Sequence, residues 1–568
     1  MEEYVKNFKL TGKMYAEELE KCIENKTAIK CNNGIFVGKE NEDVVSFKGV
    51  PYAAPPVGEL RWKNPKETED SEDIFEAFYF GKSPIQTEWP SETGSYYEKG
   101  EDCLYLNVWV NKKNIFDNKT VMVFFHGGAF GWGGTSDPLY DGTNLVKKYD
   151  DIILVTVGYR VGLMGFVDFT GIDGCEDFKT GGNLGVLDQI CALKWIQRNI
   201  AAFGGNPKNV TIFGESAGGG SVSLLPIMEE AKGLFKRVIA ESGSVALSFS
   251  KEQCERLNKM LVRKTKCKSM DDLMALSEDE LIKINEDLND YNNYPERDGI
   301  VIPEDLYGAY ENGATKGIDL LIGTNADELR YWIREMGYDK KVVSGLEVYK
   351  ATMHIGIEND VRKLSEDEAA LLNMFFEKQK EKNPKKIWAI TEFYNEMLFR
   401  LPAIKQAESH AHNNGNAYMY YWTQQGEDKV LGACHAMELS YVFGNLDEKI
   451  YTGNLVNKEL AEVVHEMWVN FARTGNPSTT HYEWKKYDAE NRHTMLLGKK
   501  IGLTKDPKSE QRKLLMPLLK YYLNGCTYGI TYNVPYTRKL VIKVLGGAAV
   551  LAGGVVGSVV GIKRALKR

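Results

Sequence analysis

The sequence has little of what marks a nucleic-acid-binding protein or a metalloenzyme. Its 568 residues carry a net charge of -8 with both signs mixed along most of the chain, so there is no basic stripe interleaved with aromatic residues. The pair His410 and His412 lacks a cysteine or an acid at the spacing of a zinc site. The glycines at residues 218–220 do not have the spacing of a phosphate-binding loop. We therefore expect no nucleic-acid partner and no metal centre.

The sequence also lacks the cysteine pattern of a disulfide-bonded scaffold and an apolar run at its N-terminus. The nine cysteines are an odd, scattered set, which excludes a small disulfide-bonded scaffold. Residues 1–6 open with acidic side chains and lack the apolar run of a secretory signal, so we expect no signal peptide. With 43% hydrophobic residues, a chain of this length can bury a large core, and a large α/β sheet often forms one domain.

The most informative motif present is G-x-S-x-G at residues 214–218, which is typical of a nucleophile elbow. It follows an apolar run at residues 209–213, as expected at a strand-to-helix junction. The serine of such a turn sits in a strained conformation, and the glycines around it avoid clashes with neighbouring backbone. The turn exposes the hydroxyl of Ser216 and leaves the N–H of Ala217 at a helix N-terminus, where an oxyanion would form.

A second motif lies upstream of the elbow. Residues 121–125 have the pattern of a fully buried strand and run directly into residues 126–130, His-Gly-Gly-Ala-Phe. A loop of this H-G-G type supplies further oxyanion N–H groups in α/β-hydrolases. Residues 121–245 alternate strand and helix patterns, as a mostly parallel sheet demands. Two halves of one hydrolytic site are therefore predicted.

These motifs, with several others in the same order, resemble those of the type-B carboxylesterases, which include para-nitrobenzyl esterases and cholinesterases. The resemblance covers about residues 30–525 and implies an α/β-hydrolase fold, with a large, mostly parallel central sheet flanked by helices. It also implies a hydrolase that acts on small carboxylic esters. The other matching segments are residues 47–56, 101–108, 158–162, 182–189 and 203–207.

A serine nucleophile needs a base, and the base needs an acid that holds its tautomer. His435 lies in residues 432–439, a segment similar to the family's catalytic-histidine loop, after the strand-like residues 418–422. The other histidines stand in settings typical of surface or structural residues. The resemblance therefore implies that Ser216 is the nucleophile and His435 the general base and acid.

The acid is expected after another strand. Residues 320–325 have the pattern of a strand that ends in a turn, and the adjacent carboxylates Asp327 and Glu328 follow it. The family motif places the triad acid at the second of these, Glu328, and usually has a glycine next. This chain has Leu329 there, which allows a local change in the turn, so Asp327 stays the alternative acid.

Carried over by position, the oxyanion donors are the backbone N–H groups of Gly128, Ala129 and Ala217. Alanine replaces the third glycine of the family's loop, but an N–H donor needs no particular side chain. The implied reaction passes through an acyl-enzyme and requires no metal or organic cofactor. The alternative is a non-catalytic, cholinesterase-like binding or adhesion module on the same fold, and the intact triad argues against it.

The positions of the cysteines, compared with those of the family, indicate the cellular compartment. Secreted relatives bridge the cysteine that matches Cys103 to another upstream, and residues 80–86 of this chain contain none. A second family bridge begins near Cys267, and residues 271–276 lack its partner. Both absences suit a reducing compartment, so we expect a cytoplasmic catalytic domain.

The remaining segments are expected to be caps and a tail. Residues 251–312 and 338–415 are charged and helix-prone, with a capping box at residues 277–280, and are expected to cap the active site. We expect the catalytic domain to span residues 1–535. Within residues 538–568, an uncharged, glycine-rich apolar run is flanked by lysine and arginine on both sides, which predicts a transmembrane or membrane-associated helix that attaches the protein to a membrane. The sequence gives neither the oligomeric state nor the orientation of this tail.

Overall fold

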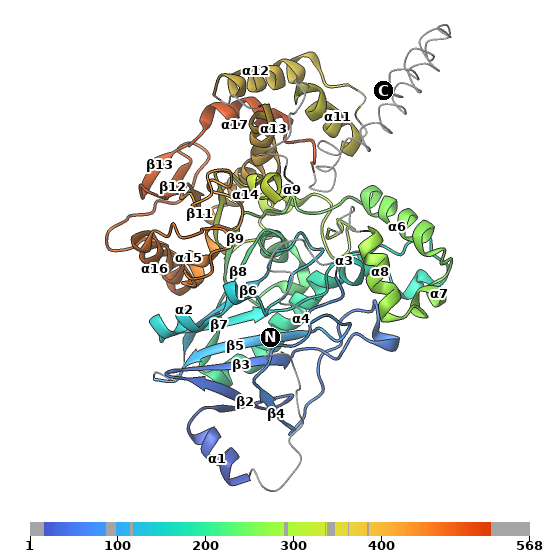
Figure 1. Ribbon diagram of the computed structural model, residues 1–568, viewed down its shortest axis with the longest axis vertical. Helices are drawn as coiled ribbons and strands as arrows, with labels where there is room; N and C mark the ends of the chain where they lie inside the picture. Colours follow the sequence, from blue (N-terminus) through green and yellow to red (C-terminus); the bar gives the residue numbers. More distant parts are fainter. Residues whose placement is uncertain are drawn as a thin grey trace.

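One extended, twisted sheet is the scaffold of the structure (Figure 1). This computed structural model describes residues 16–86, 98–113, 118–288, 294–335, 347–359, 363–382 and 386–523, with the single residues 337 and 361. Among these residues the sheet has 13 strands in the order β1-β2-β3-β5-β7-β6-β8-β9-β10-β11-β12-β13, with β4 beside β2. The strands are β1 (Ala28–Cys31), β2 (Gly34–Asn41), β3 (Val44–Pro51), β4 (Ile74–Ala77), β5 (Tyr105–Asn111), β6 (Lys119–Phe125), β7 (Ile152–Val157), β8 (Gly205–Glu215), β9 (Arg237–Glu241), β10 (Asp319–Asn325), β11 (Asn416–Trp422), β12 (His493–Leu497) and β13 (Gly502–Lys505).

Parallel pairing dominates the centre of this sheet. The strands from β7 through β6, β8, β9, β10 and β11 to β12 are all parallel to their neighbours. The pairs from β1 to β7 at one edge, and β12 with β13 at the other, are antiparallel. The expected large, mostly parallel sheet is therefore confirmed.

The core lies on both faces of the sheet. On β6, Val121, Val123 and Phe125 belong to one buried cluster, whereas Met122 and Phe124 belong to the other. Successive side chains of a strand point to opposite faces, so both faces need a cover. Helix α4 (Leu184–Asn199) contributes side chains to the first cluster and α16 (Lys458–Thr474) to the second, which places helices on both sides of the sheet.

Two helical insertions interrupt the succession of strands, where the cap segments were expected. Between β9 and β10 the chain forms α6 (Lys251–Thr265), α7 (Met270–Met274), α8 (Glu278–Leu288) and α9 (Leu306–Glu311); the predicted capping box precedes α8, since Glu280 N–H bonds to the Ser277 hydroxyl. Between β10 and β11 lie α10 (Arg330–Glu335), α11 (Glu347–Asn359), α12 (Glu366–Lys382), α13 (Lys386–Tyr394), the π-helical turn η11 (Asn395–Arg400) and α14 (Leu401–His412). The other helices are α1 (Ala16–Glu24), α2 (Thr143–Lys148), α3 (Gly162–Gly165), α5 (Ala217–Leu224), α15 (Leu439–Phe443) and α17 (Ser509–Leu515).

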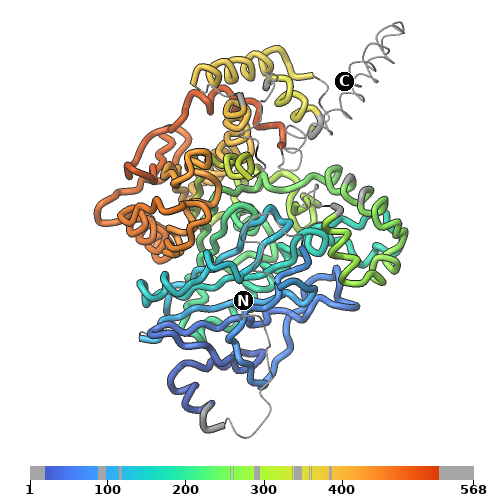
Figure 2. Tube along the Cα trace, in the orientation of Figure 1, coloured from blue at the N-terminus to red at the C-terminus, as the bar shows by residue number. Residues whose placement is uncertain are grey.

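The described part of the chain ends far from where it begins. Figure 2 shows the blue N-terminal hairpin at one end of the molecule and the last red segment packed near the yellow helices of the second insertion at the other. No helix within these described residues is long and apolar enough to cross a membrane. The tail predicted at residues 538–568 lies outside them, so its membrane attachment stays a prediction. All eight cysteines in the described residues are free thiols.

A buried ion pair joins two of the sequence segments that carry the family resemblance. Arg160 follows β7, and its guanidinium donates to Asp188 of α4 at 2.8 Å from Nε and 2.7 Å from Nη2. The N–H of Arg160 donates to the same carboxylate at 3.0 Å. Both side chains are at most 1% exposed. Such a pair in the core fixes α4 against the strand end, but each charge depends on the other for its stability.

Replacing Arg160 with methionine is expected to lower the free energy of unfolding by about 3–5 kcal/mol, because Asp188 is left buried without its partner. Urea denaturation followed by fluorescence measures the change. Lys194→Met is the control. Lys194 lies on α4, as Asp188 does, but the ion pair that it forms with Glu230 is solvent-exposed and contributes little to stability. Equal stability of the Arg160→Met variant and the control would contradict the role given to the buried pair.

Candidate active site

Ser216 lies where β8 turns sharply into α5. Its backbone has φ 58° and ψ -117°, a strained conformation for a residue with a side chain. The packing explains the glycines on either side: a Cβ on Gly214 would lie 2.6 Å from the carbonyl carbon of Gly218, and a Cβ on Gly218 only 1.9 Å from the carbonyl oxygen of Phe125. The turn therefore has the geometry expected of a nucleophile elbow.

The H-G-G loop follows β6, the strand directly beside β8. Gly127 packs against the elbow, since a Cβ there would lie 3.3 Å from the Cβ of Ser216. Gly128 and Ala129 have positive φ values of 107° and 51°. Within the described part of the chain, the N–H groups of Gly128, Ala129 and Ala217 donate to no other residue. Free N–H groups on a loop against the serine are an arrangement that can bind an oxyanion.

His435 and Glu328 are in close polar contact beside the elbow. His435 Nδ1 lies 2.6 Å from Glu328 Oε2, and both side chains are buried. The other carboxylate oxygen of Glu328 accepts a hydrogen bond from Asn325 N–H and another from the Ser242 hydroxyl, each at 2.7 Å. The acid is thus fixed in orientation on both of its oxygens, and it in turn orients the imidazole.

The alternative acid, Asp327, has other partners than this histidine. Its Oδ2 accepts from Ala433 N–H at 3.0 Å, and its Oδ1 pairs with Arg330 Nε at 2.9 Å. Leu329, which stands where the family usually has a glycine, is not in a left-handed conformation, and its side chain is buried. The leucine therefore fits the turn without strain and leaves Glu328 beside the imidazole.

Two further carboxylates surround His435. Glu215 Oε1 lies 3.0 Å from His435 Nε2, without the alignment of a hydrogen bond, and Glu438 accepts from Asn325 Nδ2 behind the pair. Burial alone lowers the pKa of His435, but the charges of Glu215 and Glu328 outweigh it and raise the pKa above its ordinary value. Burial raises the pKa of Glu215 and of Glu438 as well. The histidine and these acids therefore titrate as a coupled set.

This raised pKa separates His435 from the other buried histidines. Burial lowers the pKa of His126, His410 and His465 to about 4 and that of His354 to about 3. Those rings stay neutral at pH 7, as structural histidines do. In the described structure, no hydrogen bond joins His435 to the Ser216 hydroxyl. Catalytic contacts of this kind are often loose before a substrate binds.

Two aromatic side chains pack on the imidazole of His435. The ring centroid of Trp332, on α10, lies 4.7 Å from it, and that of Phe399, in the π-helical turn η11, lies 5.0 Å from it. Trp332 and Phe399 stack on each other with centroids 6.2 Å apart. The second helical insertion therefore contributes directly to the packing of the site.

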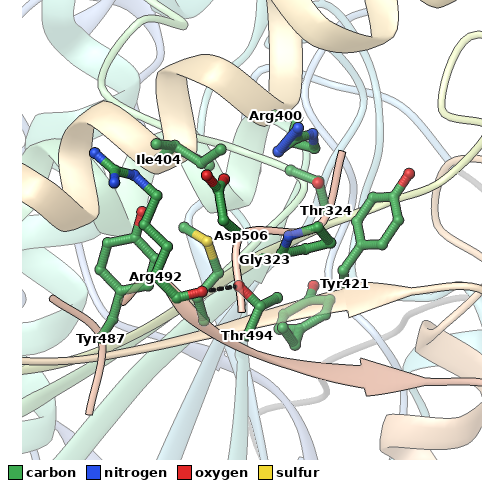
Figure 3. Close-up of a pocket in the computed structure, with 13 residues that line it drawn as sticks. Gly323, Thr324, Arg400, Ile404, Tyr421, Tyr487, Arg492, Thr494 and Asp506 are labelled. Atoms are coloured by element: carbon green, nitrogen blue, oxygen red, sulfur yellow. Dashed lines mark hydrogen bonds between the residues drawn. The ribbon is translucent and has the colours of Figure 1, made fainter. Parts of the chain in front are cut away.

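The described cavities lie apart from the predicted site residues. A small one, of about 10 Å³, lies where β10, β11, α14 and the strand β12 meet, and Figure 3 shows Arg400, Tyr487, Arg492 and Asp506 around it. That volume holds about one water molecule. A wider hollow of about 420 Å³ lies at the N-terminal hairpin, between Phe36, Phe75 and Tyr105. None of the predicted site residues lines either one, so neither is a candidate for the ester site.

Comparison with known proteins agrees with this geometry. Residues 25–515 match the sequence profile of the carboxylesterase family. The chain belongs to the carboxylesterase family. It is 35% identical over 508 residues to the para-nitrobenzyl esterase of Bacillus subtilis (strain 168), a match that covers 85% of this chain and 97% of the relative. It is 32% identical to mouse (Mus musculus) cholinesterase, over 77% of this chain and 76% of that protein.

Solved structures give the same result. A PNB esterase structure superposes with a TM-score of 0.76 at 34% identity and covers 86% of this chain and 99% of that one. A carboxylesterase of Geobacillus stearothermophilus reaches a TM-score of 0.76 at 31% identity, with the same coverage. The predicted α/β-hydrolase fold and the predicted ester hydrolase are therefore confirmed: the chain is a serine carboxylesterase.

Several polar residues at the site were not predicted from the sequence. Glu215 stands in the variable position of the G-x-S-x-G motif, and Glu438 follows His435 by three residues, so both were visible but had no assigned role. Ser242 comes directly after β9, and nothing in its local sequence indicates that its hydroxyl meets Glu328. Its left-handed backbone conformation, with φ 47°, is visible in the structure but not in the sequence.

Replacing Glu215 with glutamine is expected to shift the pH dependence of ester hydrolysis. The charge of Glu215 raises the pKa of His435, so its removal makes the imidazole neutral at lower pH and moves the acid limb of kcat/KM downward in pH. Initial rates with para-nitrophenyl acetate from about pH 5 to 9 measure this shift. Glu462→Gln, which removes an exposed carboxylate beside Lys148, is the control. An unchanged limb in Glu215→Gln would show that this carboxylate does not tune the base.

Proposed function

We propose that Ser216, His435 and Glu328 hydrolyse small carboxylic esters as a catalytic triad. The observation that carries this assignment is the buried contact of 2.6 Å between His435 Nδ1 and Glu328 Oε2, next to an elbow that presents Ser216. The family membership supplies the reaction class. The names of the relatives, a para-nitrobenzyl esterase and a cholinesterase, support esters of small alcohols as the substrate class.

In the proposed first step, Ser216 Oγ attacks the ester carbonyl carbon while His435 Nε2 takes the hydroxyl proton. For this transfer, His435 Nε2 moves from its position beside Glu215 to one beside the Ser216 hydroxyl. The imidazolium that forms is stabilised through Nδ1 by Glu328. The proton then passes from Nε2 to the leaving alcohol as its C–O bond breaks, and an acyl-enzyme remains. Water attacks the acyl carbon and gives its proton to Nε2, and that proton returns to the serine as the acid leaves.

The negative charge that develops on the carbonyl oxygen is the other requirement of the reaction. We assign its stabilisation to the N–H groups of Gly128, Ala129 and Ala217, because these groups have no acceptor among the described residues. Fixed backbone donors need no reorganisation as the charge develops, and the loss of one such donor typically costs about 10²–10³-fold in kcat. Ala129 can serve as well as glycine because only its N–H takes part.

Ser216→Ala and His435→Ala are each expected to lower kcat by about 10⁶-fold, and Glu328→Gln by about 10⁴-fold, because the nucleophile and base are lost outright whereas the acid only orients the base. Turnover of para-nitrophenyl acetate by the purified variants measures these losses.

Asp327→Asn is the matched control for Glu328→Gln. It makes the same acid-to-amide change at the neighbouring residue, and the amide oxygen can still accept the hydrogen bond from Ala433 N–H. It is expected to retain most activity. A loss in Asp327→Asn equal to that in Glu328→Gln would contradict the choice of acid, and wild-type turnover in Ser216→Ala would contradict the triad.

We also propose, from the sequence alone, that residues 538–568 attach the enzyme to a membrane, by a span or by its basic flanks on anionic lipid. The full chain is expected to sediment with vesicles that contain phosphatidylserine, and a chain truncated before Arg538 to remain in the supernatant with unchanged ester turnover. Extraction of the bound chain by about 1 M salt indicates attachment by charge, and resistance to salt indicates insertion. Equal sedimentation of both chains would contradict a role for the tail.

A further inference from the structure

The π-helical turn η11 (Asn395–Arg400) interrupts a long helical segment that runs from α13 into α14. Pro402 follows closely, and it has no N–H to donate to the preceding turn of helix. Wider turns of this kind inside α-helices are often found at functional sites. All six residues of η11 are buried, and two of them, Asn395 and Phe399, contact the acid–base pair or its supporting turn.

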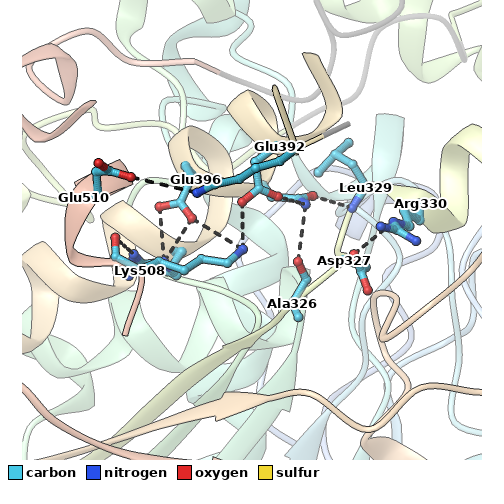
Figure 4. A network of polar contacts seen from close by, with 11 residues as sticks. Ala326, Asp327, Leu329, Arg330, Glu392, Glu396, Lys508 and Glu510 are labelled. Carbon is cyan, nitrogen blue, oxygen red and sulfur yellow. Dashed lines mark hydrogen bonds and ion pairs between the residues drawn. The ribbon is translucent and has the colours of Figure 1, made fainter. Parts of the chain in front are cut away.

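Asn395 binds the turn that carries Glu328 on both sides of the acid. Its Oδ1 accepts a hydrogen bond from Leu329 N–H at 2.9 Å. Its Nδ2 donates to the carbonyl oxygen of Ala326 at 3.4 Å. One side-chain amide therefore bridges Ala326 and Leu329, the residues that flank Asp327 and Glu328, and Figure 4 shows these two residues with the hydrogen bonds drawn as dashed lines.

An ion-pair network fixes the orientation of this amide. Nδ2 of Asn395 also donates to Glu392 Oε2 at 3.3 Å, and the other oxygen of Glu392 binds Lys508 Nζ at 2.7 Å. Glu396 pairs with Arg400 within the turn at 3.0 Å, and Arg400 donates to the carbonyl oxygen of Lys508. Because the carboxylate of Glu392 can only accept, it directs the NH₂ group of Asn395 to itself and leaves the amide oxygen for Leu329.

The same turn also restrains the base. Phe399 packs on the imidazole of His435 with ring centroids 5.0 Å apart, and it stacks on Trp332. The acid is held through a hydrogen bond to the main chain after it, and the base is held by an aromatic face. Both supports come from η11, within one helical insertion.

We propose that Asn395 is a positioning residue, which holds the turn after β10 so that Glu328 faces His435. This inference rests on the triad proposed above. Because a misplacement of about 1 Å in a catalytic group can cost about 10²-fold in rate, one hydrogen bond to the turn is sufficient to affect kcat. The hydrogen bonds described for the Asn395 side chain go to Leu329, Ala326 and Glu392, and none goes to the serine or the oxyanion loop, so its effect on substrate binding should be small.

Asn395→Leu keeps the volume of the side chain and removes the acceptor for Leu329 N–H. It is expected to lower kcat for para-nitrophenyl acetate by about 10–100-fold with KM within about twofold of wild type, because the ground-state contacts of the ester do not change. Steady-state kinetics with active-site titration by an organophosphate measures kcat per folded site.

Asn395→Asp separates positioning from stability. It keeps an oxygen for Leu329 N–H but places a second carboxylate beside Glu392, so it should be less stable than Asn395→Leu. If Asn395 positions the acid, the aspartate variant keeps a kcat within about fivefold of wild type although its Tm is lower. If kcat instead follows Tm, with the aspartate variant slower than the leucine variant, the residue is only structural and the inference is overturned.

Asn199→Leu is the matched control. The amide oxygen of Asn199 accepts from Asn32 N–H at 2.8 Å and its Nδ2 donates to the carbonyl oxygen of Trp195, so it makes the same kinds of bond far from the site. Its loss is expected to lower Tm and leave kcat unchanged. Wild-type kcat in Asn395→Leu overturns the positioning role alone, whereas wild-type turnover in Glu328→Gln overturns the triad on which it rests.

Discussion

Parallel pairing of β6 with β8 is the constraint on which the rest of the site depends. Phe125 pairs with Gly214, so the H-G-G loop and the nucleophile elbow leave the sheet at the same edge. Neighbouring strands are about 4.8 Å apart, and at that spacing the carbonyl of Phe125 leaves no room for a methyl group on Gly218. The glycines of the motif therefore follow from the packing of two strand ends. The serine hydroxyl and the free N–H groups of the loop are what this packing leaves available for chemistry.

Buried charge is the second constraint, and it acts on the base. His435 is placed among Glu215, Glu328 and Glu438, where an ionised carboxylate is costly unless it is paired or hydrogen-bonded. Ser242 and Asn325 provide the donors for Glu328, and the imidazolium provides the balancing positive charge. The resting site thus favours the protonated base, whereas attack by the serine requires the neutral one. The negative charge of these carboxylates also stabilises the imidazolium that forms during acyl transfer. The carboxylates therefore lower activity at low pH and stabilise the transition state.

Much of this site is predictable from the sequence, because its principal members lie in contiguous motifs. The elbow, the H-G-G loop and the histidine loop each carry their geometry in a few adjacent residues, and Glu328 follows a recognisable strand. Ser242 and Asn395 lie in no such motif: they reach the acid only because β9, β10 and the second insertion pack together. The order of the strands is equally non-local, since β7 lies between β5 and β6. Nor does any pattern in the sequence predict the π-helical turn at residues 395–400.

The second helical insertion supports the triad residues through one short segment. Its inner turn, η11, is bonded to the main chain of the acid and packed on the base, so a shift there moves Glu328 and His435 relative to each other. The ion pairs of Glu392 with Lys508 and of Glu396 with Arg400 join this part of the insertion to the start of α17 and resist such a shift. A turn that is held in this way keeps the triad geometry within tolerances well below the size of a side chain, which catalysis requires.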